Sequence, residues 1–370
     1  KPLSVYAPAM DAGLITPYSV RDNEPFMKLN GRDWPRNDSG GYTGPMTIRT
    51  AVAKSMNAVA VRVVDEYTPR AAYDFLTDRL NFKNLTVNDI DLAPMALGGM
   101  NGGVTVREMA AGFSVFLNDG IFNGARTYTR VLNSDGTVLL DNEPLGRHVF
   151  EREQTVYYMR DVLKGVTSSE MGGTGRRINV PGMDTAGKTG TSQKKNDLWF
   201  CGFTPYYVGT TWFGYDSNYD LSNVRSNPSV TVWNTVMNLI HEGMEPKEFD
   251  MGDDANFTTA SYCTRTGLAP SSACSTATGR YWKGDEPSET CTKCRRRVTK
   301  PKPSTNNPQD PETADPNAPA ADPENPSVAP PDTTEPPVNE GGGDGDGLTI
   351  PTEPVLPTSP VTGNDDPESE

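Results

Sequence analysis

The stretch from residue 185 to residue 215 constrains the fold of this chain more than any other. It begins with a small, polar run at 185–191, and two runs rich in aromatic residues follow at 198–204 and 207–215, separated by a Thr-Pro turn. Such runs, bounded by turn residues, predict strands, and so short a connection joins antiparallel neighbours. The pattern therefore predicts an antiparallel hairpin beside a strand that contains Lys188-Thr-Gly190.

Helical patterns lie on both sides of this region. Thr105 and Glu108 form a capping-box pattern ahead of one apolar stripe, and Thr68-Pro69 is typical of a helix start. Helices that precede a mainly antiparallel sheet indicate an α+β fold, an α/β sandwich with helices flanking the sheet, and not a parallel doubly wound one. Helices are expected at 47–54, 58–67, from 68, 105–120, 156–165 and 230–241. In the last of them the side chains expected to face the core are Val232, Val236, Leu239 and Ile240.

The end of the chain has a different composition. The last 70 residues carry 15 acidic side chains and one basic one, so the whole formal charge of −14 lies there, together with 17 of the 32 prolines and no aromatic residue. Such a segment buries too little apolar surface to offset its ordering entropy. We therefore expect a folded domain at 1–250, a small Cys-containing segment at 251–298 and a disordered acidic tail at 299–370. The neutral body lacks the basic surface that binds nucleic acid or anionic membranes.

Histidine and cysteine give little support for a metal or histidine-based site. His148 and His241 each stand alone, which favours structural roles, and Cys201 in an apolar run is expected to be an inert core thiol. The other cysteines are spaced C-x10-C-x16-C-x2-C, with only one tight pair. This spacing favours one or two disulfides in an oxidising compartment, with zinc and reduced thiols as weaker alternatives. No metal site and no cofactor are assigned. The four cysteines are Cys263, Cys274, Cys291 and Cys294.

A phosphate-binding loop is a competing interpretation of the lysine motif, because G-x-x-x-x-G-K-T reads from Gly182 to Thr189. Such a loop needs a hydrophobic strand before its first glycine and a long helix after Lys-Thr, so that backbone N–H groups cradle phosphate. Here Pro181 stands against the first glycine and strands follow the motif. Nucleotide binding is therefore not favoured.

Three short motifs together carry more information than any one of them. Lys188-Thr-Gly-Thr191 is preceded by Ser55-Met-Asn57, an S-x-N pattern at a break between two helices, and by Lys1-Pro2 at the start. Together with the glycine-rich block at 97–105 and the run at 186–205, these motifs resemble the transpeptidase domain of class A penicillin-binding proteins. The signature of that family is S-x-x-K, S-x-N and K-T-G. The resemblance extends from residue 1 to about residue 250.

The resemblance implies a role for each motif residue. Lys1, as the lysine of S-x-x-K, would be the general base, and Ser55, between Lys1 and Lys188, would relay a proton to the leaving amine. Asn57 would bind the donor peptide backbone, and the backbone N–H of Thr191 would supply half of an oxyanion hole. Lys188, Thr189 and Thr191 would receive the terminal carboxylate of the donor, and Gly190 between them is a further substrate-binding residue. Two plainer interpretations stay open: a capped helix junction at Ser55-Met-Asn57, and a solvated strand lysine at position 188.

The function that the resemblance implies is a D,D-transpeptidase of peptidoglycan synthesis that works through a serine acyl-enzyme. The serine would lie three residues before Lys1, outside this chain, so we expect the chain alone to be inactive. The expected partners are stem peptides ending in D-Ala-D-Ala, β-lactams and other parts of the cell-wall synthesis machinery. A membrane anchor and a glycosyltransferase domain would lie upstream, which places the protein on the extracytoplasmic face of the membrane. The acidic tail would be either a solvated tail or a spacer through the wall.

Alternative functions remain. One is a non-catalytic relative that binds penicillin or wall peptides without turnover, which would lack the serine upstream of Lys1. A β-lactamase is a weaker alternative, since it needs an additional carboxylate to activate water, and the sequence identifies none.

Overall fold

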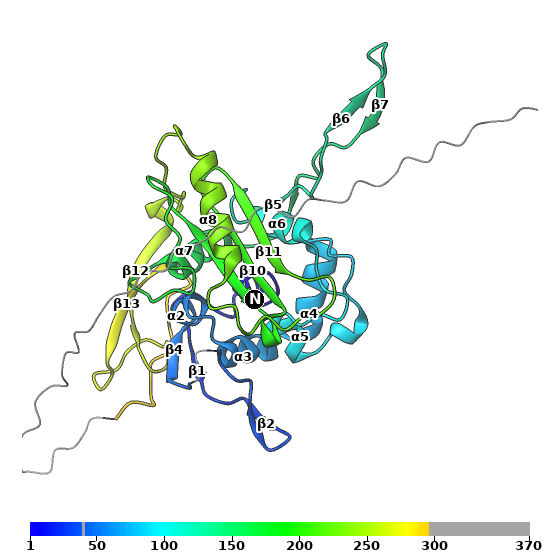
Figure 1. The fold of residues 1–370 in the computed structure, drawn as a ribbon. Helices are drawn as coiled ribbons and strands as arrows, with labels where there is room; N and C mark the ends of the chain where they lie inside the picture. Colours follow the sequence, from blue (N-terminus) through cyan, green and yellow to red (C-terminus); the bar gives the residue numbers. More distant parts are fainter. Residues whose placement is uncertain (39–40, 296–370) are drawn as a thin grey trace, which may run out of the picture. The chain divides into compact units, whose positions relative to one another are not determined.

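The computed structural model describes residues 1–38 and 41–295, and the predicted tail at 299–370 lies outside this range (Figure 1). The longer helices are α2 (Ile48–Ala53), α3 (Asn57–Tyr67), α4 (Pro69–Asp74), α5 (Leu92–Leu97), α6 (Val106–Ser114), α7 (Gln154–Thr167) and α8 (Pro228–Ile240). The short helical segments are η1 (Pro2–Tyr6), α1 (Ala7–Asp11), η2 (Phe75–Arg79), η3 (Val87–Asp89), η4 (Gln193–Lys195) and η5 (Asp254–Asn256).

The strands pair only in antiparallel fashion in this part of the chain. The largest sheet has the order β11-β10-β9, and the others are two-stranded. The strands are β1 (Val20–Asn23), β2 (Met27–Leu29), β3 (Arg32–Trp34), β4 (Gly44–Thr47), β5 (Ile121–Phe122), β6 (Arg130–Leu132), β7 (Val138–Asp141), β8 (Arg147–His148), β9 (Ala186–Thr191), β10 (Asp197–Phe203), β11 (Val208–Gly214), β12 (Phe257–Cys263) and β13 (Thr276–Trp282). The predicted hairpin and its neighbouring Lys-Thr-Gly strand are thus confirmed.

Side chains of β10 alternate between two helical layers, as the period of two along a strand requires. Phe200 packs edge-on against Trp233 of α8, with ring centroids 5.1 Å apart. Phe203 points to the opposite side, where its ring lies 6.2 Å from that of Phe116, beyond α6. Helix α7 runs beside β9 and α2 in the same large core. The sheet is therefore sandwiched between helices, and the predicted α+β fold is confirmed.

The predicted helix starts are confirmed where a side chain caps them. The Thr105 hydroxyl accepts a hydrogen bond from the backbone N–H of Glu108, and the Glu108 carboxylate accepts one from the N–H of Thr105. The Thr68 hydroxyl caps α4 ahead of Pro69. Helix α6 ends at Ser114, earlier than expected, yet Phe113 and Phe116 of the predicted stripe are fully buried.

The predicted inward face of α8 is wrong. The expected side chains are 43% to 60% exposed, whereas Val230, Trp233 and Met237 are buried against the sheet. Trp233 decides the orientation, because its ring fills the space over Phe200 and its indole N–H donates to the carbonyl of Gly209 at 3.0 Å. A helix presents only one stripe to a sheet, so the second apolar stripe is left outside. The corrected residues are Val232, Val236, Leu239 and Ile240.

Two hairpins extend the body. Strands β6 and β7 project from it as an arm (Figure 1). The β12–β13 hairpin instead packs on α7, where Trp282 stacks on Tyr157 and the Tyr158 hydroxyl accepts from the N–H of Trp282 and donates to Asp285. Among the described residues, no helix combines the length and apolar character needed to cross a membrane.

Candidate active site

The junction between α2 and α3 presents Ser55 to the sheet. Helix α2 ends at Ala53 and α3 begins at Asn57, and Ser55 between them has a φ of +60°, a left-handed conformation that is uncommon outside glycine. The Ser55 hydroxyl lies 2.7 Å from Nζ of Lys188, which donates to it. A single residue with reversed backbone therefore turns the chain and directs a hydroxyl at β9.

Lys1 reaches the same junction from the start of η1. Its Nζ donates to the carbonyl of Ser55 at 3.0 Å and contacts the side-chain oxygen of Asn57. Burial, followed by the nearby positive charge of Lys188, holds the pKa of the Lys1 side chain well below its usual value. The shift favours the neutral amine, which is the form that a general base requires.

Lys188 lies in the middle of β9 and is only 6% exposed. Besides Ser55, its Nζ donates to the carbonyl of Thr189 at 3.0 Å. Burial lowers the pKa of Lys188 to about 8. This ammonium group is a buried cation beside the serine, so the interpretation of Lys188 as a solvated strand lysine is wrong.

Strand β9 is the edge of its three-stranded sheet, so one of its sides is open. The N–H of Ser192 donates to the carbonyl of Asp197 on β10, and hydrogen-bonding direction alternates along an antiparallel strand. The N–H groups of Thr189 and Thr191 therefore point to the free edge, available to a backbone or to an oxyanion. A side chain at position 190 would be crowded, because an added Cβ would lie 3.0 Å from the Cβ of Trp199. Gly190 therefore leaves the strand without a side chain at this point.

Two residues that sequence analysis missed hold these groups in place. Asn37 is buried, and its side-chain oxygen accepts from the N–H groups of Asn57 at 2.8 Å and Ala58 at 3.3 Å, so it caps α3 from a distant loop. The Thr174 hydroxyl lies 2.7 Å from that of Thr189, and its N–H donates to the carbonyl of Ala53 at 3.1 Å. Thr174 thereby ties the end of α2 to β9.

Neither loop carries a sequence signal for these roles. Asn37 stands among turn-forming residues and Thr174 in a glycine-rich stretch at 172–175, and both patterns indicate loops without indicating what the loop contacts. The structure thus brings Lys1, Ser55, Asn57 and Lys188 together around one junction, Thr189 contacts Lys188 and Thr174 beside it, and Gly190 and Thr191 follow on the same strand. Their roles stay predictions.

His241 and Cys201 have structural roles in this fold. His241 is buried, with Nε2 2.9 Å from the Thr204 hydroxyl and Nδ1 close to the carbonyl of Met237. His148 lies on the exposed strand β8. Cys201 is buried, and burial raises the pKa of its thiol to about 12. The predicted disulfides are absent: all five cysteines are free thiols in this structure.

Comparison with known proteins gives the family. The model of the penicillin-binding protein transpeptidase domain matches residues 1–221, more than half of the chain. The chain belongs to this family. Within it, the chain is the transpeptidase domain of a class A penicillin-binding protein, as the resemblance of its motifs implied.

Two curated relatives show how much of a longer protein the chain represents. Penicillin-binding protein 1A of Clostridium acetobutylicum is 37% identical over 263 residues, which are 68% of this chain and 31% of that protein. Penicillin-binding protein 1A of Clostridium tetani is 32% identical over 314 residues, 79% of this chain and 39% of that protein. The chain thus spans about a third of the length of these relatives.

Solved structures confirm the fold. Penicillin-binding protein 1A from Haemophilus influenzae superposes with a TM-score of 0.62 at 23% identity, over 79% of this chain and 48% of that one. The penicillin-binding protein PonA1 from Mycobacterium tuberculosis gives a TM-score of 0.54 at 18% identity, over 67% of this chain and 68% of that one. At such identities the likeness supports the architecture alone.

Proposed function

We propose that the parent protein is a D,D-transpeptidase that cross-links peptidoglycan stem peptides through a serine acyl-enzyme. The nucleophile is a serine three residues before Lys1, which puts it one helical turn from the Lys1 amine. The observation that carries the proposal is the convergence of two lysines on Ser55, the partly buried Lys1 at the start of η1 and the buried Lys188 of β9, with Asn57 beside them.

The proposed acylation balances as follows. The serine oxygen attacks the carbonyl carbon of the penultimate D-Ala, and its proton passes to the neutral amine of Lys1. The amide bond to the terminal D-Ala breaks, and its nitrogen takes the hydroxyl proton of Ser55, which the proton held on Lys1 replaces, while Lys188 polarises that hydroxyl. The developing oxyanion accepts from the N–H of Thr191 and from that of the serine. An acceptor amine then cleaves the ester in transpeptidation, or water does so in a carboxypeptidase reaction.

The terminal carboxylate of the donor meets a cation and hydroxyls on the edge of β9. Lys188 supplies the positive charge, and the hydroxyls of Thr189 and Thr191 donate hydrogen bonds. The same groups are suited to the carboxylate of a β-lactam, whose strained amide takes the place of the D-Ala-D-Ala bond. β-Lactams are therefore the proposed covalent inhibitors.

Labelling with a fluorescent penicillin tests this proposal. We expect the parent protein to be labelled, its variant with alanine three residues before Lys1 to be unlabelled, and the 370-residue chain alone to be unlabelled. Ser55→Ala in the parent should slow acylation by about 10²- to 10⁴-fold, the usual range for proton transfer by a positioned group. Ser217→Ala, which removes an exposed serine, is the matched control.

Labelling of the 370-residue chain would contradict the assignment of Lys1. A parent protein that binds penicillin reversibly, without a covalent adduct, would instead be the non-catalytic relative.

We further propose that the parent protein is bifunctional, with an upstream glycosyltransferase domain, that it is anchored on the extracytoplasmic face of the membrane and that it works with other wall-synthesis proteins. Lipid II polymerisation by the parent protein tests the first of these.

A further inference from the structure

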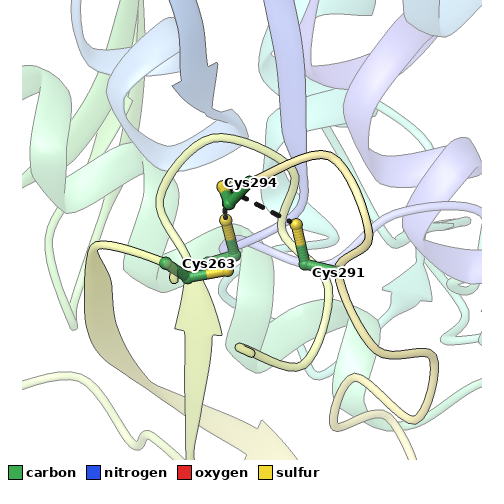
Figure 2. Close-up of side chains that lie close together, drawn as sticks. Cys263, Cys291 and Cys294 are labelled. Atoms are coloured by element: carbon green, nitrogen blue, oxygen red, sulfur yellow. Dashed lines mark hydrogen bonds between the residues drawn. The ribbon is translucent and has the colours of Figure 1, made fainter. Parts of the chain in front are cut away.

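The four remaining cysteines, far from the catalytic lysines in sequence, come together in one group. Their sulfur atoms all lie within 4.8 Å of one another. Cys263 is the last residue of β12, Cys274 precedes β13 by two residues, and Cys291 and Cys294 follow the hairpin. Figure 2 shows the side chains of Cys263, Cys291 and Cys294 directed at a common point.

The spacing of the sulfurs matches a tetrahedral metal site. The sulfur of Cys294 lies 3.7 Å from that of Cys263 and 3.8 Å from that of Cys291. A zinc ion binds thiolates at about 2.3 Å, and the edge of a tetrahedron with that radius is about 3.8 Å. Four sulfurs in one group, rather than two separate pairs, are the arrangement expected of four ligands.

The backbone around the cysteines fixes their positions without a metal. The carbonyl of Cys263 accepts from the N–H groups of Thr266 and Gly267, which closes a tight turn. The N–H of Cys291 donates to the carbonyl of Ala269 at 2.8 Å, so the last segment is joined to the loop that follows Cys263. Gly267 has a φ of +75°, and an added Cβ would lie 2.9 Å from the N of Val20. The turn is therefore built against the body of the domain.

Ser271 lies within hydrogen-bonding distance of one of the four sulfurs, and two of the four cysteines are partly exposed. The N–H of Ser271 lies 3.4 Å from the sulfur of Cys274, and its hydroxyl lies 3.3 Å from the same atom. Cys263 and Cys291 are buried, whereas Cys274 and Cys294 are partly exposed, which leaves a route for an ion to enter. Four thiolates around a divalent ion leave a net charge of −2, and four cations stand within two residues of the ligands along the chain: Arg265, Lys293, Arg295 and Arg296.

We propose that Cys263, Cys274, Cys291 and Cys294 form a structural zinc site that fastens the segment after β13 to the β12–β13 hairpin. Zinc suits the set because four soft thiolates fill its tetrahedral shell and leave no position for substrate. The site is separate from the proposed catalytic chemistry. The β12–β13 hairpin packs on α7 through Trp282, Tyr157 and Tyr158. The zinc site would therefore attach the last described residues, through the hairpin, to the body of the domain.

Metal analysis of the 370-residue chain, purified with zinc and without chelator, tests this site. We expect one zinc per chain, and the double variant Cys291→Ser/Cys294→Ser should lose it. Cys201→Ser, which removes the cysteine outside the group, should keep it. Replacement by Co²⁺ should give the thiolate-to-metal absorption and the intense visible bands of a tetrahedral site. Iron in place of zinc, or no bound metal, would overturn the assignment.

A thiol count separates zinc from disulfides without relying on variants that fold. The wild-type chain is denatured in the presence of a chelator and without reductant, and its reactive thiols are titrated. Five thiols per chain are expected for the zinc site. One or three would show that the cysteines pair as disulfides, and would refute the proposal. Stepwise titration of the native chain with an organomercurial should release zinc in proportion to the thiols modified.

Discussion

The lowered pKa of Lys188 makes a signed prediction about stability and pH. In the unfolded chain a lysine has a pKa of about 10.5, whereas burial lowers that of Lys188 to about 8 in the fold. Between these values the unfolded chain binds a proton that the native state does not, so the free energy of unfolding rises with pH. One pKa unit corresponds to about 1.4 kcal/mol, and the whole window is worth about 3 kcal/mol.

This contribution of Lys188 to the free energy of unfolding is fully present above pH 10.5, the pKa in the unfolded chain. It is lost as the pH falls through about 8, the pKa in the fold. It is isolated by comparing the wild type with Lys188→Met, because Met keeps the length of the side chain and does not titrate. The difference in unfolding free energy between the two, from urea denaturation at pH 7 to 10, should move by about 2 to 3 kcal/mol in favour of the wild type. Lys1 is present in both proteins, so the part of its pKa shift that burial causes cancels, whereas the part caused by the charge of Lys188 is removed in the variant.

Lys28→Met provides the matched control, since Lys28 is an exposed lysine paired with Asp33. Its difference from the wild type should change little over the same range. If the difference in unfolding free energy between the wild type and Lys188→Met did not change between pH 7 and 10, burial of the Lys188 ammonium would have no energetic cost, and the reasoning would be refuted. A difference that moves in favour of Lys188→Met as the pH rises would refute the sign of the pKa shift.

Three further predictions concern the supports of the site and the core. Ser55→Gly should be more stable than Ser55→Ala by about 1 kcal/mol, because only glycine adopts a positive φ without strain. At Ser217, which lacks a positive φ, the alanine variant should be the more stable one. Urea denaturation of the four variants measures both differences. Asn37→Ala should cost about 2 to 4 kcal/mol, since it uncaps α3 and leaves buried donors unpaired, against less than about 0.5 kcal/mol for the exposed Asn218→Ala. Arg160→Met should cost about 3 kcal/mol or more in thermal unfolding, because the buried guanidinium donates to three backbone carbonyls; a loss below 1 kcal/mol would show that water satisfies them.

The sheet and most helices could be predicted because their signals are local. Runs rich in aromatic residues on either side of a Thr-Pro turn specify β10 and β11, and a capping box specifies the start of α6. The catalytic set was predictable for another reason: three short motifs recur in order and at family spacing, although nothing in the residues between them indicates that Lys1, Ser55 and Lys188 meet. The resemblance, and not periodicity, supplied that contact.

What could not be predicted depends on contacts between distant segments. Helix α8 carries two apolar stripes, and only the position of Phe200 beneath Trp233 selects the one that is buried. Asn37 and Thr174 act across the fold, so their loops show no pattern that names a partner. The cysteine spacing was misleading because β12 and β13 return Cys274 to the vicinity of Cys263, a juxtaposition that sequence distance conceals.

The backbone at Ser55 explains why the site is braced from so many sides. A non-glycine residue at a φ of +60° costs of order 1 kcal/mol, and burying the ammonium of Lys188 beside it costs about 3 kcal/mol more near neutral pH. Such strain persists only where the surroundings over-determine the conformation. Asn37 caps α3 on one side of the junction, and Thr174 ties α2 to β9 on the other. If the proposed proton relay is correct, these two supports hold the Ser55 hydroxyl within 2.7 Å of Lys188 before substrate arrives, so that ordering it costs nothing during the reaction.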